Sequence, residues 1–232
     1  MRIMTFNTQH CLNYLEQRID YPLFAKAIVE SGADVIGLNE MRDEGERDDY
    51  EPQMKILSEL TGIENYYFAR AIYCKGMNPY GNGILSKHKI VDVKTLPIPD
   101  PDGRTEGKYY ETRCILKARL ECGLTILVTH FGLNPDEQEN AVKAVLENLE
   151  GEKCVLMGDF NVLPDDKVLL PIREKMKDTA ELFGCEKFSF PSDKPDRKID
   201  YMFVTPDIEV ISADIPETVV SDHRPHTADV IF

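Results

Sequence analysis

The segment Val155-Leu-Met-Gly-Asp159-Phe-Asn161 decides how we interpret the chain, because an apolar run ends there in a carboxylate and a carboxamide. The run is short and uncharged, as expected for a buried β-strand. Side chains alternate along a strand, so Asp159 and Asn161 are predicted to point to one side and Phe160 to the other. A carboxylate can orient and deprotonate water, and an amide N–H can hold a developing negative oxygen. The alternative is a turn in which Asp159 caps a following helix.

A strand–helix–strand pattern around this segment occurs twice in the chain. It is predicted over residues 2–40 and again over residues 124–161. In each copy the first strand ends in a polar residue and the second in an acid, the pairs being Asn7 with Glu40 and His130 with Asp159. Ligand sites commonly lie at the carboxyl ends of strands in α/β proteins. The two copies therefore indicate two comparable layers whose strand ends meet at one cleft.

The rest of the chain also alternates between helical and β-rich patterns. Apolar stripes predict helices over residues 19–30, 52–60 and 135–149. Runs bounded by turn residues predict strands near residues 2–7, 34–40, 65–72, 82–86, 90–96, 112–120, 123–129, 155–157, 199–204, 208–212 and 227–232. Because no linker or low-complexity segment divides the chain, we predict a single domain over residues 1–232.

A second candidate motif, Ser221-Asp222-His223-Arg224-Pro225, lies near the C-terminus. Neighbouring side chains on a straight strand face opposite ways, so Asp222 and His223 could reach one site only in a turn, which Pro225 favours. His223 titrates near neutral pH and could stabilise a negative oxygen or protonate a leaving group. Asp200, an isolated acid on an apolar strand, could orient such a histidine. Taken alone, each segment is more simply explained as a surface turn or an ordinary strand.

Polar residues at other strand ends complete the set of candidates. Glu40 is our candidate ligand for a divalent cation, because Mg²⁺ takes one or two carboxylates and keeps several waters. Asn7 could touch the same ion or orient Glu40, and turn capping is the alternative for both. His130 ends an apolar strand, where a structural histidine is the usual explanation. Arg113 suits a phosphate group, but an internal salt bridge explains it equally well.

Composition limits the class of ligand and the compartment. The chain has 232 residues and a formal net charge of −14. An acidic protein is repelled by a bare polyanion unless metal ions or a basic patch offset the charge, so avid non-specific binding of nucleic acid is disfavoured. The six cysteines form no CxxC pair, and we find neither a membrane-length apolar run nor a secretory pattern. We expect a cytoplasmic protein with reduced thiols.

The order of these motifs, more than any one of them, resembles the endonuclease/exonuclease/phosphatase superfamily, which has the DNase I-like fold. The matching segments are Phe6-Asn7, Asn39-Glu40, Tyr80-Gly-Asn82-Gly-Ile-Leu-Ser86, Glu111-Thr-Arg113, Thr129-His130, Gly158-Asp-Phe-Asn161, Ile199-Asp200-Tyr201 and Ser221-Asp-His223. They span nearly the whole chain. The resemblance implies an α/β fold in four layers, an α/β/β/α sandwich of two mixed β-sheets with helices outside.

The resemblance also implies a hydrolytic centre for phosphate esters. Glu40 would bind Mg²⁺ or Mn²⁺ with Asn7 beside it, and Asp222 would join the ligands of the metal. Asp159 would activate the attacking water, while Asn161 helps to hold the phosphate.

Five further residues have implied roles around the same phosphate. His223, oriented by Asp200, would stabilise the transition state, and His130 would contact the phosphate from the other side. Asn82 and Arg113 would contact the phosphate or support the residues that do.

Three features bear on the substrate. The second acid that some DNA-repair members carry near the first motif is Gln9 here, and long basic insertions are missing. The loop over residues 188–198 resembles one found in small bacterial hydrolases. Its Lys194, Arg197 and Lys198 could form a basic rim or a solvated turn. We expect a monomer that hydrolyses a phosphate mono- or diester of a small molecule, with no membrane partner. The alternatives are a nuclease acting on DNA or RNA and a non-catalytic binding protein on the same fold.

Overall fold

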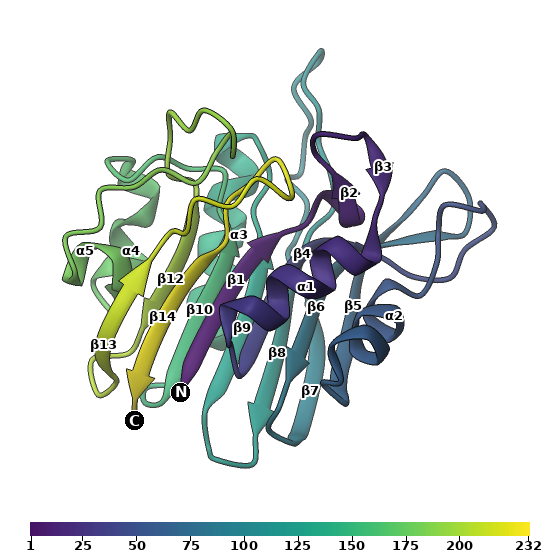
Figure 1. Ribbon diagram of the computed structural model, residues 1–232. Coiled ribbons are helices and arrows are strands. Elements are labelled where there is room, and N and C mark those ends of the chain that lie inside the picture. Colours follow the sequence, from purple (N-terminus) through teal and green to yellow (C-terminus); the bar gives the residue numbers. More distant parts are fainter.

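The computed structural model describes residues 1–232 and shows two six-stranded β-sheets packed face to face with helices on both outer surfaces (Figure 1). Helices α1 (Tyr21–Ser31) and α2 (Gln53–Thr61) cover one sheet. Helices α3 (Pro135–Asn148) and α4 (Leu170–Arg173) cover the other sheet, and the short helix α5 (Thr179–Leu182) lies at the edge of the sandwich against a strand of each sheet. The predicted four-layer α/β/β/α sandwich is therefore confirmed.

The first sheet has one parallel pair of strands at its centre. Its order is β13 (Glu209–Asp214), β14 (His226–Ile231), β1 (Arg2–Asn7), β4 (Val35–Arg42), β6 (Asn78–Ser86) and β5 (Asn65–Cys74). Strands β1 and β4 are parallel and α1 connects them, whereas the other neighbours are antiparallel. The register places Asn7 opposite Asn39 at the carboxyl ends of the parallel pair.

The second sheet repeats this arrangement. Its order is β11 (Lys177–Asp178), β12 (Asp200–Val204), β10 (Cys154–Asp159), β9 (Thr125–His130), β8 (Cys114–Leu120) and β7 (Ile90–Pro97). Here β9 and β10 form the parallel pair and α3 connects them. The register places His130 opposite Asp159. The repeated strand–helix–strand pattern in the sequence therefore corresponds to the two parallel pairs of the sandwich.

The interior consists of three apolar layers, one between the sheets and one under each set of helices. The sheets approach closely at Gly37 on β4, where a Cβ atom would lie 2.9 Å from both Met157 and Val128. Apolar side chains therefore fill the space between the sheets to native density, and even one added methyl group would displace its neighbours.

Several short elements escaped the sequence analysis. They are the 3₁₀ helices η1 (Gln9–Cys11) and η2 (Lys167–Leu169), the small hairpin of β2 (Leu12–Asn13) and β3 (Arg18–Ile19), β11, α4 and α5. Each is too short to show a periodic pattern. The long connection between β7 and β8 is the teal loop that projects beyond the upper edge of the sandwich in Figure 1.

No helix is both long enough and apolar enough to cross a membrane.

Candidate active site

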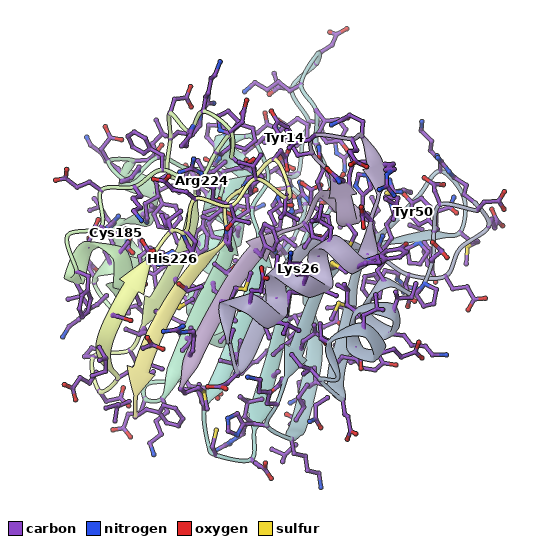
Figure 2. All side chains as sticks on the ribbon, in the orientation of Figure 1. Tyr14, Lys26, Tyr50, Cys185, Arg224 and His226 are labelled. Carbon is purple, nitrogen blue, oxygen red and sulfur yellow. The ribbon has the colours of Figure 1, made fainter.

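A pocket of about 810 Å³ opens at the edge of the sandwich where the parallel strands end. Seven of the ten predicted site residues line it: Glu40, Arg113, His130, Asp159, Asn161, Asp222 and His223. Of the other three, Asn7 and Asp200 are hydrogen-bonded directly to lining residues, and Asn82 lies further inside. Figure 2 labels Arg224, which lies at this edge between His223 and β14 and donates from Nε to Ser192 O over 2.7 Å.

Asp159 occupies the centre of the pocket floor and is almost completely buried. Its Oδ1 accepts the backbone N–H of Asn161 at 2.9 Å, and its Oδ2 accepts Nδ2 of Asn7 from the other sheet at 3.0 Å. Gly158, with φ 144°, makes this position possible, because a Cβ atom there would lie 1.8 Å from Thr129 O. Burial raises the pKa of Asp159. A carboxylate with a raised pKa is a better proton acceptor from water.

Two imidazoles flank this carboxylate. Nε2 of His130 lies 3.5 Å from Asp159 Oδ2, and Nε2 of His223 lies 3.6 Å from the same oxygen. Both separations exceed the usual N–H···O range of 2.7–3.2 Å, so neither ring donates a normal hydrogen bond to Asp159. The two N–H groups are therefore available to an oxygen entering the pocket.

His223 is held as a cation by its acidic neighbours. Its Nδ1 lies 2.9 Å from Oδ2 of Asp200, and its ring packs against Phe190 at 4.7 Å between centroids. Burial alone would lower the pKa of His223, but the charges of Asp200 and Asp159 outweigh burial and raise it. At neutral pH both ring nitrogens are donors, one to Asp200 and one toward the pocket.

His130 is neutral, and its tautomer follows from its neighbours. Nη1 of Arg113 lies 3.0 Å from its Nδ1, and a guanidinium can only donate, so the ring proton sits on Nε2. Burial, and then the charge of Arg113, lowers the pKa of His130 well below its usual range. Nδ2 of Asn161, 3.3 Å from His130 Nε2, therefore donates instead to Phe131 O at 3.1 Å. The proton on Nε2 points at the pocket.

The backbone is locally distorted at two site residues, Glu40 inside β4 and Asn161 just after the end of β10. Glu40 lies in a register shift between β4 and β6 and has φ 63°, while Asn161 has φ 51°. Bulges next to active sites commonly re-aim a side chain. Asn161 was predicted to share a face with Asp159 by strand alternation, and this reason was wrong. Strand β10 ends at Asp159, and Asn161 reaches the pocket through its left-handed backbone.

Asn39 joins the two sheets behind the pocket. Its Nδ2 donates to Oδ1 of Asn82 and to Thr129 O, both at 2.8 Å, and its Oδ1 accepts the backbone N–H of Asp159 at 3.0 Å. In the sequence, Asn39 stands out only as part of the Asn39-Glu40 motif, and no role is predicted for it. Asn82 in turn donates to Cys114 O at 3.0 Å. Its amide is therefore occupied at both ends, and its side chain is buried behind the pocket rather than exposed to it.

The predicted basic rim is only partly present. Lys198 is buried and pairs with Asp178 at 2.7 Å, 3.6 Å from the Tyr201 ring centroid, so it cannot form part of a surface rim. Arg197 does line the pocket and pairs with Asp196 at 2.7 Å. The prediction failed for Lys198 because a buried ion pair cannot be distinguished from a solvated lysine in one sequence.

The pocket has the ligand atoms that a hard divalent cation requires. Glu40 receives one hydrogen bond, from Nδ2 of Asn7 at 3.1 Å. Burial raises the pKa of Glu40, and the charge of nearby Asp222 raises it further. A dication between these two carboxylates would relieve both effects. Asp159, Asp200 and His223 also have metal-ligand spacing, and Oδ1 of Asp200 is buried without a partner. The charge of His223, however, already offsets part of the charge of these two carboxylates.

A four-layer sandwich with this pocket of carboxylates, imidazoles and arginine defines the class of DNase I-like phosphoesterases and nucleases. The chain belongs to the endonuclease/exonuclease/phosphatase family, whose sequence model matches residues 4–223. Three solved structures share this fold over nearly the whole of this chain, although their sequence identity to it is low.

The first is an endonuclease/exonuclease/phosphatase from Beutenbergia cavernae, with a TM-score of 0.80, 22% identity and coverage of 99% of this chain and 71% of that one. The second is a mannosyl-6-phosphatase from Bacteroides thetaiotaomicron, with a TM-score of 0.77, 16% identity and full coverage of both chains. The third is a 3′ phosphatase from Neisseria bound to product DNA hairpin, with a TM-score of 0.70, 16% identity and full coverage of both chains. No curated protein matches the chain significantly.

Proposed function

We propose that this protein hydrolyses a phosphate mono- or diester of a small molecule with the help of a divalent cation. The observation that carries this proposal is the setting of Asp159, a buried carboxylate with an imidazole N–H on either side and Glu40 bonded to the same asparagine. This arrangement places a proton acceptor, two oxygen-directed donors and a metal ligand around the floor of one pocket.

The side chains divide the chemistry among them. Asp159 orients the attacking water and accepts its proton, which its raised pKa favours. His130 and His223 offer their Nε2–H groups to phosphate oxygens, and the charge of His223 offsets the negative charge that develops during in-line attack. Asp200 and Arg113 act through these rings. Asp200 holds His223 at Nδ1 and Arg113 holds His130 at Nδ1, which leaves Nε2 of each ring directed at the pocket.

The cation is Mg²⁺ or Mn²⁺, which suit oxygen ligands. We assign it to Glu40 with Asn7 and Asp222 nearby, because Glu40 accepts a single hydrogen bond, from Asn7, and forms no direct ion pair. When bound, such an ion supplies positive charge to the phosphate oxygens and helps to orient the ester.

A small substrate fits both the charge and the dimensions of the site. The net charge of −14 disfavours long polyanions, and a pocket of about 810 Å³ is in the range that holds metabolite-sized ligands. One of the solved structures with this fold is a mannosyl-6-phosphatase, and another is a phosphatase bound to DNA. We further propose that the protein acts as a cytoplasmic monomer.

The direct test is a set of phosphomonoesters, phosphodiesters, phospholipids and oligonucleotides, offered with Mg²⁺, with Mn²⁺ and with EDTA. We expect metal-dependent release of phosphate or alcohol from at least one small ester, and EDTA should abolish it. Asp159→Asn keeps the shape of the side chain but removes the base, and it should lower kcat by roughly 10²–10⁴-fold. Duplex or abasic DNA cleaved far faster than every small ester would refute the choice of substrate. Equal activity of Asp159→Asn and wild type would favour a non-catalytic binding protein.

A nuclease is the second candidate, and one observation favours it. The β7–β8 loop projects beyond the upper edge of the sandwich (Figure 1). It carries the exposed cation Lys108 and Arg104, which is paired with Asp100 at 3.4 Å. They could contact a phosphate backbone beyond the ester being cleaved. Binding through such contacts weakens steeply with salt. Strong inhibition of oligonucleotide cleavage between 50 and 200 mM salt (~10-fold or more) would support this candidate.

A further inference from the structure

One side of the pocket is apolar and solvent-exposed, in contrast to its charged floor. It consists of Tyr109, Leu133 and Leu163, whose exposed fractions are 63%, 57% and 49%. We call these three residues the apolar wall. Single exposed leucines are common on protein surfaces, but several gathered at the mouth of a polar pocket indicate contact with a ligand.

Helix α3 holds all three segments of the apolar wall in place. Nδ2 of Asn134 donates to Tyr109 O at 2.6 Å. Nε2 of Gln138 donates to Gly132 O at 3.2 Å and to Asn161 O at 3.1 Å, which ties the segments before Leu133 and Leu163 to the same helix turn. The backbone that carries the wall is thus anchored before any ligand arrives, so a ligand would not have to immobilise these segments.

Glu137 adds a third tie from the same turn. It completes the capping box with Asn134, and its Oε1 accepts the backbone N–H of Glu111 at 3.1 Å. Gly132 leaves the space for this carboxylate, because a Cβ atom there would lie 2.4 Å from Glu137 Cδ. The segment that contains Tyr109 and Glu111 is therefore anchored to the start of α3.

The apolar wall continues directly from the residues assigned to the phosphate. Leu133 follows His130 by three residues, and Leu163 follows Asn161 by two. Tyr109 donates its hydroxyl to Oε2 of Glu111 at 2.6 Å. An ester whose phosphate lies on the pocket floor can therefore extend its next atoms along this wall.

We propose that the apolar wall binds the alcohol part of the ester, and that the preferred substrate is a phosphate ester of an alcohol with a flat, apolar ring face. This inference rests on the proposed function and names its substrate class. The ring of Phe190 lines the same pocket and offers a second flat apolar surface. Asp196 and Glu111 line it too, but each is paired with an arginine of the same pocket, Arg197 and Arg113. The apolar face of the alcohol, and not its charge, is therefore what the wall selects.

The test compares two probes in the intact protein with its optimal metal. Phenyl phosphate carries a flat apolar ring, and glycerol 2-phosphate carries none. We would measure kcat/KM for both and take the ratio of phenyl phosphate to glycerol 2-phosphate. Comparing this ratio between the wild type and a variant cancels the intrinsic reactivity of the two esters.

The variant is the double substitution Leu133→Ser and Leu163→Ser, and the matched control is Leu60→Ser. Leu60 lies on α2 away from the pocket and is 49% exposed, as Leu163 is. We expect the ratio to fall about tenfold in the double variant, which is the discrimination that a small apolar contact provides, and to stay at the wild-type value in the control. All three proteins should have the same melting temperature.

The outcomes separate this inference from the proposed function. An unchanged ratio in the double variant, together with hydrolysis that Asp159→Asn abolishes, overturns the apolar wall and leaves the proposed function standing. A ratio that falls equally in Leu60→Ser overturns it as well. If wild type hydrolyses no ester with Mg²⁺ or Mn²⁺, the proposed function fails and the inference fails with it.

Discussion

Replacing Asn39 with leucine should damage both stability and activity, although Asn39 does not touch the pocket. Leucine has nearly the same shape as asparagine but cannot hydrogen-bond. Three buried groups would lose their partner: the N–H of Asp159, the carbonyl of Thr129 and Oδ1 of Asn82. The side chain of Asn39 is completely inaccessible, so water could not replace it without opening the sandwich.

The size of the effect follows from these three contacts. Each buried group left without a partner costs about 1–3 kcal/mol, so three of them cost roughly 3–6 kcal/mol if their neighbours relax partly. Burying the leucine methyl groups returns about 1–2 kcal/mol. The free energy of unfolding should therefore fall by about 1–5 kcal/mol, out of a total of roughly 5–15 kcal/mol for a typical domain.

The assay is urea unfolding followed by far-UV circular dichroism, with Asn65→Leu as the control. Asn65 is half-buried on the edge strand β5 and makes one side-chain bond, from Nδ2 to Ser86 O at 3.2 Å, which water can replace. We expect that control to lose less than about 1 kcal/mol. The folded fraction of Asn39→Leu should also show kcat/KM reduced roughly 10²-fold, because Asp159 loses a fixed position. If Asn39→Leu unfolds within about 1 kcal/mol of Asn65→Leu, the cross-sheet role of Asn39 is wrong.

Three further predictions follow from buried polar groups. Burial, and then the charge of Lys198, lowers the pKa of His226 to about 4. Below about pH 6.5 the imidazole of His226 is protonated in the unfolded state but stays neutral in the folded state. The free energy of unfolding should therefore fall by roughly 2–3 kcal/mol between about pH 6.5 and pH 4. The variant His226→Gln should lose this part of the pH dependence. Glu137→Gln places an N–H₂ group among backbone donors, so the melting temperature and kcat/KM should both decrease, which differential scanning calorimetry and initial rates would detect. Glu40→Gln should raise the Mg²⁺ concentration for half-maximal rate by about tenfold or more, whereas exposed Glu44→Gln should leave it unchanged.

Much of this fold was predictable because long buried strands and amphipathic helices have strong periodic patterns. Strand β1, from Arg2 to Asn7, was predicted to the residue, and α3 lies within one residue of its predicted end. The short hairpin of β2 and β3 was missed because two residues in a strand carry no pattern. Register, which brings Asp159 opposite His130, depends on long-range pairing that the sequence indicated only through its internal repeat.

The candidate site likewise contains residues that the sequence could predict and residues that it could not. Residues with conspicuous chemistry at strand ends, such as His223 and Glu40, were selected in advance, and the structure places them around one pocket. Residues that act through hydrogen bonds across the sandwich were not selected from the sequence. Glu137 looks like an ordinary helix-capping residue in the sequence, and only the folded structure shows that the same carboxylate also holds the segment of Glu111. The sequence contains the residue types, but not which distant backbone group each one reaches.

The division of the site between two sheets explains why the asparagines behind the pocket matter as much as the acids that line it. Asp159 belongs to the second sheet, while Asn7 and Asn39, which hold its carboxylate and its backbone, belong to the first. Neither sheet alone can set the distance between Glu40 and Asp159, because each carries only one of them. Between the sheets lie mainly apolar contacts, which are non-directional and tolerate sliding. Directional hydrogen bonds from asparagine are therefore what fix the two sheets in register at the pocket. A substitution that loosens this register should reduce activity before it unfolds the protein.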